Sequence, residues 1–251
     1  MPGYTAVMEV QLHELTPVLS AAEREATERQ QQQRQQRQLA MSDTRRALVL
    51  DAARSVFAER GVEGASIREI ARRAGYTPGA IYSYFDSKEA IYAALLAESL
   101  ERLNAEVAGA RSFKSQPQLT LTSKAQAWFG FYARSPRDLD LGFYLVQGLS
   151  AHGLAGDLNQ QLNGRLQDAL RPCEVALQAM GLSLDVAMRE NTALFAHGVG
   201  LLLLQHTGRL GLFGQSAEAL FVTYVEQLVE RLNPGAPATS RRLDQADLFG
   251  L

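Results

Sequence analysis

The sequence has a single cysteine, Cys173, in 251 residues. One thiol can form neither a disulfide framework nor a cysteine-rich zinc module. Cys173 follows Pro172 in an apolar stretch, so we expect a reduced thiol in the protein core. The sequence also lacks phosphate-binding glycine loops, nucleophile elbows and metal-ligand spacings of histidine, cysteine and carboxylate. We therefore expect no enzyme activity, no catalytic residues, no metal and no cofactor.

Long apolar runs are also missing. The longest, residues 193–204, contains a histidine and two glycines and is shorter than the about 18 residues that cross a bilayer. The first twenty residues show no pattern of a secretion signal, so we expect a cytoplasmic protein with no membrane partner. The formal net charge is only −2, so any binding to nucleic acid must come from a local patch.

The two ends differ from the middle of the chain. Residues 1–41 end in a run of seven Gln and two Arg, Gln30–Gln38, and we expect a disordered N-terminal arm there. Asn233-Pro234-Gly235 is a strong helix stop, so residues 233–251 should form a flexible tail. Between the ends, apolar residues recur with helical spacing and nowhere alternate convincingly. The sequence therefore predicts an all-α fold.

Short helices with clear capping signals follow the first helix of this middle region. That helix should end at Gly61. Ser66 then begins a capping box, in which its hydroxyl accepts from the Glu69 amide and the Glu69 side chain reaches back. Gly75 ends this second helix, and Thr77 followed by proline starts a third. Two short helices joined by a tight glycine turn are typical of the DNA-binding helix-turn-helix.

Ser66–Ala90 closely resembles the DNA-binding signature of the TetR/AcrR family of transcriptional regulators, and the resemblance extends back to Phe57–Gly61. It implies an N-terminal three-helix DNA-binding domain and a C-terminal helical domain for ligand binding and dimerisation. We place the first, with its linking helix, at residues 42–104, and the second at residues 105–232.

The resemblance also indicates the residues that contact DNA. Arg68 can reach a base, since an arginine fork suits guanine O6 and N7, although a solvated helix face explains it equally well. Tyr82 and Tyr84 are expected at phosphates, with packing of the Tyr82 ring in the core as the alternative. Lys88, in the first turn of the next helix, should bind a phosphate. The expected DNA-binding residues are Ser66, Arg68, Thr77, Pro78, Gly79, Ala80, Tyr82, Tyr84 and Lys88.

One such unit makes few base contacts and would bind weakly. We therefore expect a homodimer on an inverted repeat, with half-sites about 34–36 Å apart or a multiple of a turn. The resemblance implies that the two last helices of each subunit pair in a four-helix bundle, with an intramolecular core as the alternative. The expected interface residues are Leu194, Gly198, Leu201, Leu202, Phe221, Tyr224, Val225 and Leu228.

Aromatic and scattered polar residues in the C-terminal region match the composition of small-ligand sites, and the family places its inducer pocket in this domain. Packing in the core is the alternative for each aromatic ring. The expected pocket residues are Trp128, Phe131, Tyr132, Phe143, Tyr144, Gln147, Asn191 and His197.

The sequence thus predicts a regulator, and more specifically a repressor, that a small molecule of unknown identity releases from a palindromic DNA operator. The alternative is a ligand-independent regulator or adaptor whose C-terminal domain binds another protein. Saturable binding of a small molecule that loosens DNA would distinguish the two.

Overall fold

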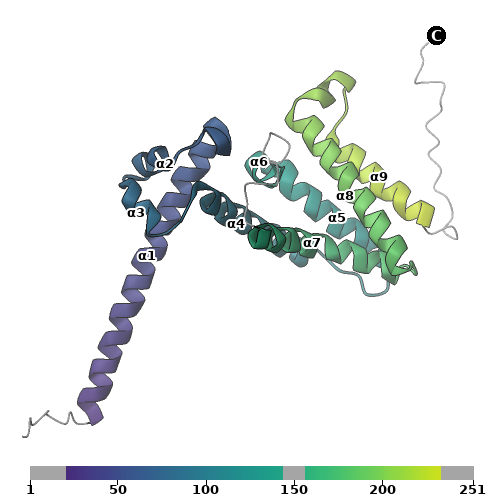
Figure 1. Cartoon of the computed structure of the whole chain (residues 1–251). Helices are drawn as coiled ribbons and strands as arrows, with labels where there is room; N and C mark the ends of the chain where they lie inside the picture. The colour runs from purple at the N-terminus through teal and green to yellow at the C-terminus, as the bar shows by residue number, and fades with distance from the viewer. Residues whose placement is uncertain (1–20, 144–155, 233–251) are drawn as a thin grey trace, which may run out of the picture. The chain divides into compact units, whose positions relative to one another are not determined.

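The computed structural model describes residues 21–143 and 156–232, and these residues form helices and the turns between them, without a strand (Figure 1). The expected all-α class is confirmed. The helices are α1 (Ala21–Gly64), α2 (Ile67–Ala74), α3 (Pro78–Tyr82), α4 (Lys88–Gly109), α5 (Pro117–Arg134), α6 (Pro136–Phe143), α7 (Gly156–Ala179), α8 (Leu184–His206), the 3-10 helix η3 (Arg209–Phe213) and α9 (Ala217–Leu232).

Helix α1 contains the polar run Gln30–Gln38, where we expected a disordered arm. Gln, Arg, Glu and Ala are all good helix formers, so a polar run can be helical although it cannot form a core. The chain divides into two compact units, residues 1–48 and residues 49–251. Within α1, Gly61 interrupts the helical geometry with φ 68° and ψ 170°, a conformation that suits glycine.

Residues 49–251 contain two hydrophobic cores, and α4 contributes to both. Ile91 and Leu95 near its start pack with α1, α2 and α3, whereas Leu103 and Val107 near its end pack with α5, α7, α8 and α9. The expected domain boundary after residue 104 therefore lies inside a continuous helix. Both domains share α4, because its apolar pattern does not break between the two cores.

The centre of the second core is Trp128 on α5. Its ring lies 5.4 Å from that of Phe195 and 6.5 Å from that of Phe221, measured between centroids. Gly198 on α8 lets the helix approach this closely, since a Cβ there would lie 2.7 Å from the Trp128 ring. Cys173 is buried in the same core, and burial raises the pKa of its thiol to about 12. The expectation of a core thiol is confirmed.

Lys124 on α5 is buried and holds the end of α4. Its Nζ donates to the carbonyls of Val107, Ala108 and Ala110 at 2.9, 3.0 and 2.7 Å. A cation is favourable there because the last carbonyls of a helix lack partners and carry the negative end of its dipole.

Candidate DNA-binding surface and regulatory core

The first helix of the helix-turn-helix has the expected ends. The Ser66 Oγ accepts from the Glu69 amide at 3.2 Å, and this bond satisfies a free donor at the start of α2. Gly75 ends α2 in the left-handed region, with φ 75° and ψ 27°. The next amide, that of Tyr76, donates back to the Ala71 carbonyl at 2.9 Å. The chain thus makes a tight turn into α3.

Helix α3 is short and half exposed. The Thr77 Oγ1 accepts from the Ala80 amide at 3.2 Å, and Pro78 is at the start of the helix, where it loses no hydrogen bond. Ile81 is fully buried in the first core, whereas Thr77, Pro78 and Gly79 are exposed. The core-facing side chain anchors α3 and leaves its first turn accessible.

None of the nine expected DNA-binding residues is buried. Ser66, Arg68 and Tyr82 are exposed with the three residues at the start of α3, and Ala80, Tyr84 and Lys88 are partly buried. Tyr82 is 54% exposed, while Tyr84 packs against the first core. The tyrosine that packs is therefore Tyr84, and the alternative of a core position for Tyr82 does not hold.

Helix α2 carries three arginines, and two of them form ion pairs with glutamates. Glu69 pairs with Arg60 at 3.1 Å and with Arg72 at 3.2 Å. Arg73 forms two bonds to Glu59, at 2.6 and 2.9 Å, and holds the pKa of Glu59 below its usual value. Arg68 is exposed and forms no ion pair with any residue in the described ranges.

Lys88 has a contact that the sequence does not indicate. Its Nζ donates to the Glu63 carbonyl at 3.1 Å and lies 3.5 Å from that of Ala65. The Lys88 ammonium thus binds main-chain carbonyls between α1 and α2. The side chain remains partly accessible to solvent. The partners are 23 and 25 positions earlier, so no local pattern could have found them.

A family model for bacterial regulatory proteins of the tetR family matches residues 49–95, which contain this helix-turn-helix. Residues 49–95 are thus similar to the DNA-binding region of that family. The transcriptional activator FasR of Mycolicibacterium smegmatis is 30% identical over 117 residues, 47% of this chain and 53% of FasR. The transcriptional repressor AcnR of Corynebacterium diphtheriae is 41% identical over 64 residues, 26% of this chain and 34% of AcnR. The chain thus spans about half the length of the first relative and a third of the second.

Solved structures share the fold. A tetR-family regulator from Rhodococcus RHA1 matches with a TM-score of 0.58 and 20% identity, over 75% of this chain and 96% of the other. The regulator FadR from Bacillus subtilis, solved in complex with stearoyl-CoA, matches with a TM-score of 0.51 and 22% identity, over 73% and 97%. Within residues 21–143 and 156–232, no helix is apolar over enough residues to cross a membrane.

The second core buries most of the expected pocket residues that the structure describes. Trp128, Phe131, Tyr132 and Asn191 are all buried. Burial raises the pKa of Tyr132, with the nearby Asp138 carboxylate as a second cause. The alternative of core packing therefore fits the three aromatic rings. Tyr144, Gln147 and the side chain of Phe143 lie outside the described residues.

Three buried polar side-chain atoms in this region have no hydrogen-bond partner among residues 21–143 and 156–232: Trp128 Nε1, Asn191 Oδ1 and His197 Nε2. The other amide atom of Asn191, Nδ2, donates to the Leu170 carbonyl at 3.2 Å. The His197 ring stacks on Tyr224, with centroids 4.0 Å apart, and burial lowers the His197 pKa. Buried polar atoms are nearly always paired, so each of these three atoms can take a further hydrogen-bond partner.

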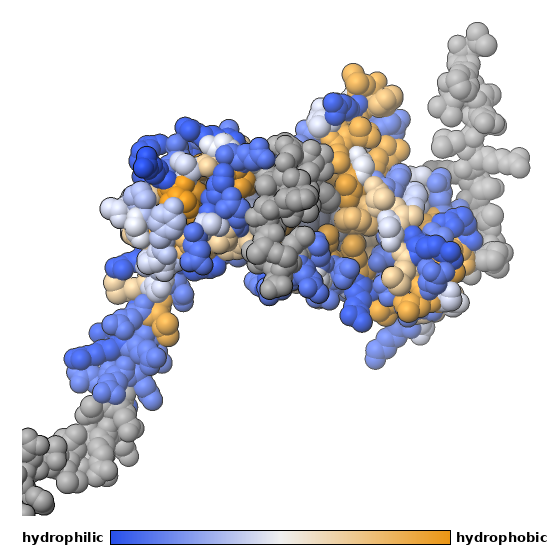
Figure 2. Space-filling model, viewed as in Figure 1, coloured by the Kyte–Doolittle hydropathy of each residue, from blue (hydrophilic) through white to orange (hydrophobic). Residues whose placement is uncertain are grey.

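The expected dimer residues lie in the interior of one chain. Seven of them are buried in the second core, and the eighth, Tyr224, is partly buried against it. Within one chain they pack as part of an intramolecular core. Helix α8 is apolar on more than one side, and the sequence could not show which side the same chain covers. Its exposed apolar residues are different ones, among them Met188 and Leu204, and apolar surface extends over this part of the molecule (Figure 2).

Proposed function

We propose that this protein is a sequence-specific DNA-binding transcriptional regulator that binds a palindromic operator as a homodimer and is released by a small molecule. The supporting observation is the capped α2–α3 unit within the matched residues 49–95, in which none of the expected DNA-binding residues is buried. The Arg68 guanidinium donates two hydrogen bonds to a base. Ser66, Tyr82 and Lys88 contact phosphates. Few side chains here can read bases, so DNA shape contributes to specificity.

The test is selection of bound duplexes from a random library with the purified protein, followed by affinity measurements for the Arg68→Ala variant. We expect an inverted repeat, and a preference relaxed by about 1–3 kcal/mol at one base pair of each half-site. Arg189→Ala, on the exposed side of α8, is the matched control. An equal loss of affinity for all DNA sequences would mean that Arg68 contacts the DNA backbone. A selection that enriches no sequence would contradict the proposal.

Dimerisation uses the side of α8 opposite to the buried one. At about 100° per residue, the exposed Ala193, Ala196, Gly200 and Leu204 point away from the buried Asn191 and Gly198. Small residues on this side allow a second helix to approach closely. Sedimentation should show a dimer that Ala196→Arg converts to a monomer. Ala179→Arg, at the exposed end of α7, should remain dimeric, and a dimeric Ala196→Arg would contradict this interface.

The effector binds in the second core, at the three unpartnered polar atoms. The indole N–H of Trp128 can donate and the Asn191 Oδ1 can accept, while the lowered pKa of His197 keeps its imidazole neutral at pH 7. Such a site favours an uncharged or weakly polar molecule. Trp128 is the single tryptophan of the chain, so its emission reports occupancy directly. A molecule that shifts this emission should also weaken operator binding.

Repression is the output that we propose, since a dimer on an operator excludes other proteins from the same DNA. The relatives include the activator FasR and the repressor AcnR, so a reporter assay must show the sign. An adaptor whose C-terminal domain binds a protein is the alternative. Operator affinity that no small molecule changes, together with capture of a protein partner by this domain, would favour it.

A further inference from the structure

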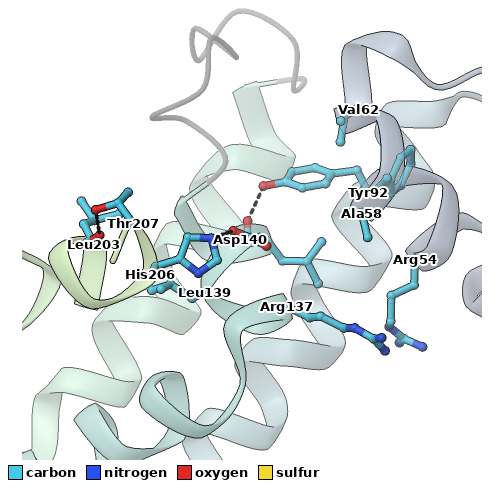
Figure 3. A pocket seen from close by; sticks show the side chains of 13 residues that line it. Arg54, Ala58, Val62, Tyr92, Arg137, Leu139, Asp140, Leu203, His206 and Thr207 are labelled. Carbon is cyan, nitrogen blue, oxygen red and sulfur yellow. Dashed lines mark hydrogen bonds and ion pairs between the residues drawn. The ribbon is translucent and has the colours of Figure 1, made fainter. Parts of the chain in front are cut away.

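Two neighbouring cavities lie where α1 and α4 meet α6, and neither is lined by Trp128, Asn191 or His197. The first, of about 350 Å³, is lined by residues of α1, α4, α6 and the end of α8 (Figure 3). The second, of about 370 Å³, is lined by residues from α1, α4 and the α5–α6 junction. Arg54, Arg137 and Leu141 line both. We call the two together the α6 crevice.

Helix α6 gives the crevice a defined wall, because it is attached to both hydrophobic cores. Leu139 packs in the second core and Leu141 packs in the first. The Tyr92 hydroxyl on α4 donates to the Leu141 carbonyl at 2.6 Å, and Figure 3 shows this bond beside the cavity. An occupant of the crevice therefore touches the DNA-binding helices α1 and α4 together with α6 and α8.

The first cavity is mainly apolar. Phe57, Val62, Tyr92, Leu139 and Leu141 line it and are each less than a tenth exposed. Its volume is in the range of about 300–1,000 Å³ that small-molecule sites occupy. Hydrocarbon is therefore the best complement for this part of the crevice.

The second cavity carries the charge of the crevice. Four arginines and a single carboxylate line it: Arg54, Arg102, Arg134, Arg137 and Asp138.

Most of these charges are compensated. Arg102 pairs with Asp138, Arg134 pairs with Glu106, and Arg54 pairs with Asp51 at 2.6 Å and with Glu98 at 3.2 Å. In the first cavity, His206 Nε2 lies 3.0 Å from Asp140 Oδ1. Arg137, which lines both cavities, is exposed and has no ion pair among the described residues. The Arg137 guanidinium is thus free to bind an anion. It lies at the boundary between the charged second cavity and the apolar first cavity.

We propose that the α6 crevice is a second ligand site that binds a small amphipathic carboxylate. The carboxylate pairs with the Arg137 guanidinium, which can donate two parallel hydrogen bonds to it. The apolar body lies in the first cavity against α1 and α8. Because the occupant bridges the DNA-binding helices and the C-terminal helices, its binding changes operator affinity. This coupling rests on the proposed function, whereas the binding itself does not.

The test is calorimetric titration of the full-length protein with octanoate as the probe, and with 1-octanol as the neutral molecule of the same chain length. We expect saturable binding of one octanoate per chain and much weaker binding of 1-octanol. Arg137→Gln should weaken octanoate binding by about tenfold, since a hydrogen bond to a charged group is lost. The control variant is Arg189→Gln, which removes an exposed arginine of α8 that does not line the crevice. It should bind octanoate like the wild type.

A second variant fills the cavity instead of removing the charge. Ala58 is exposed on α1 and lines the first cavity, so Ala58→Phe should abolish octanoate binding without disturbing a core. No saturable binding, equal affinity for 1-octanol, or wild-type affinity in both Arg137→Gln and Ala58→Phe would each overturn the proposal. Operator selection without any ligand tests the proposed function separately, so failure of one does not imply failure of the other.

Discussion

The Tyr92 hydroxyl donates a 2.6 Å hydrogen bond to the Leu141 carbonyl, and both residues are buried in the core of the helix-turn-helix. The bond attaches α6, a helix of the C-terminal domain, to the DNA-binding domain. Tyr92→Phe leaves a buried carbonyl without this donor and should lower the free energy of unfolding by about 1–2 kcal/mol. Urea denaturation measures the loss, and Tyr82→Phe at an exposed ring should leave stability unchanged. Equal effects of the two substitutions would contradict this assignment.

Gly198 should be intolerant of a side chain. A Cβ there would lie 2.7 Å from the Trp128 ring and 3.0 Å from Phe221. We expect Gly198→Ala to destabilise the protein by about 1–3 kcal/mol, since buried rings must move, which exceeds the gain of up to about 1 kcal/mol in helix propensity. Gly164→Ala on α7 has open space for its Cβ and should be stabilising. Thermal unfolding followed by Trp128 emission compares the two, and a stabilising Gly198→Ala would show that the core is looser than described.

Lys88→Ala should change two measurable quantities. Loss of a phosphate contact lowers the slope of log affinity against log salt by about one. Loss of the bond to the Glu63 carbonyl, at 3.1 Å, also reduces stability by about 1 kcal/mol. Operator titrations at several salt concentrations and urea denaturation measure them independently. Reduced stability with an unchanged slope would mean that Lys88 only holds the main chain between α1 and α2.

The ion pair between Glu190 on α8 and Arg231 on α9 should make stability depend on pH. Its two bonds measure 2.8 and 2.7 Å, and the Arg231 guanidinium holds the pKa of Glu190 below its ordinary value of 4.5. Because the folded pKa is the lower one, the stabilisation is complete above the unfolded value and is lost as the pH falls through the folded value.

Glu190→Gln should therefore cost up to about 1 kcal/mol at pH 7, and the difference from the wild type should shrink as the pH falls below 4.5. Chemical denaturation between pH 7 and pH 3 gives this difference. Glu226→Gln, at an exposed position of α9, is the control and should show little effect at any pH. A difference that stays constant over the range would exclude the pair as its source.

The local features of the helix-turn-helix could be predicted from the sequence. Ser66, Thr77 and Gly75 specify where α2 and α3 begin and end, because each acts on amides or carbonyls within a few positions. The all-α class follows from apolar spacing in the same way. The helical geometry of Gln30–Gln38 was missed because low hydrophobicity excludes a core without excluding a helix.

The sequence by itself thus determined the all-α class and where α2 and α3 begin and end, since capping and periodicity are local. The tertiary structure decided which faces are buried. It covered Leu194 and Phe221 within one chain, paired Arg73 with Glu59, and left Arg68 and Arg137 without carboxylate partners among the described residues. These outcomes depend on contacts between distant segments, and a helix that is apolar on several sides does not encode which side its own chain will cover.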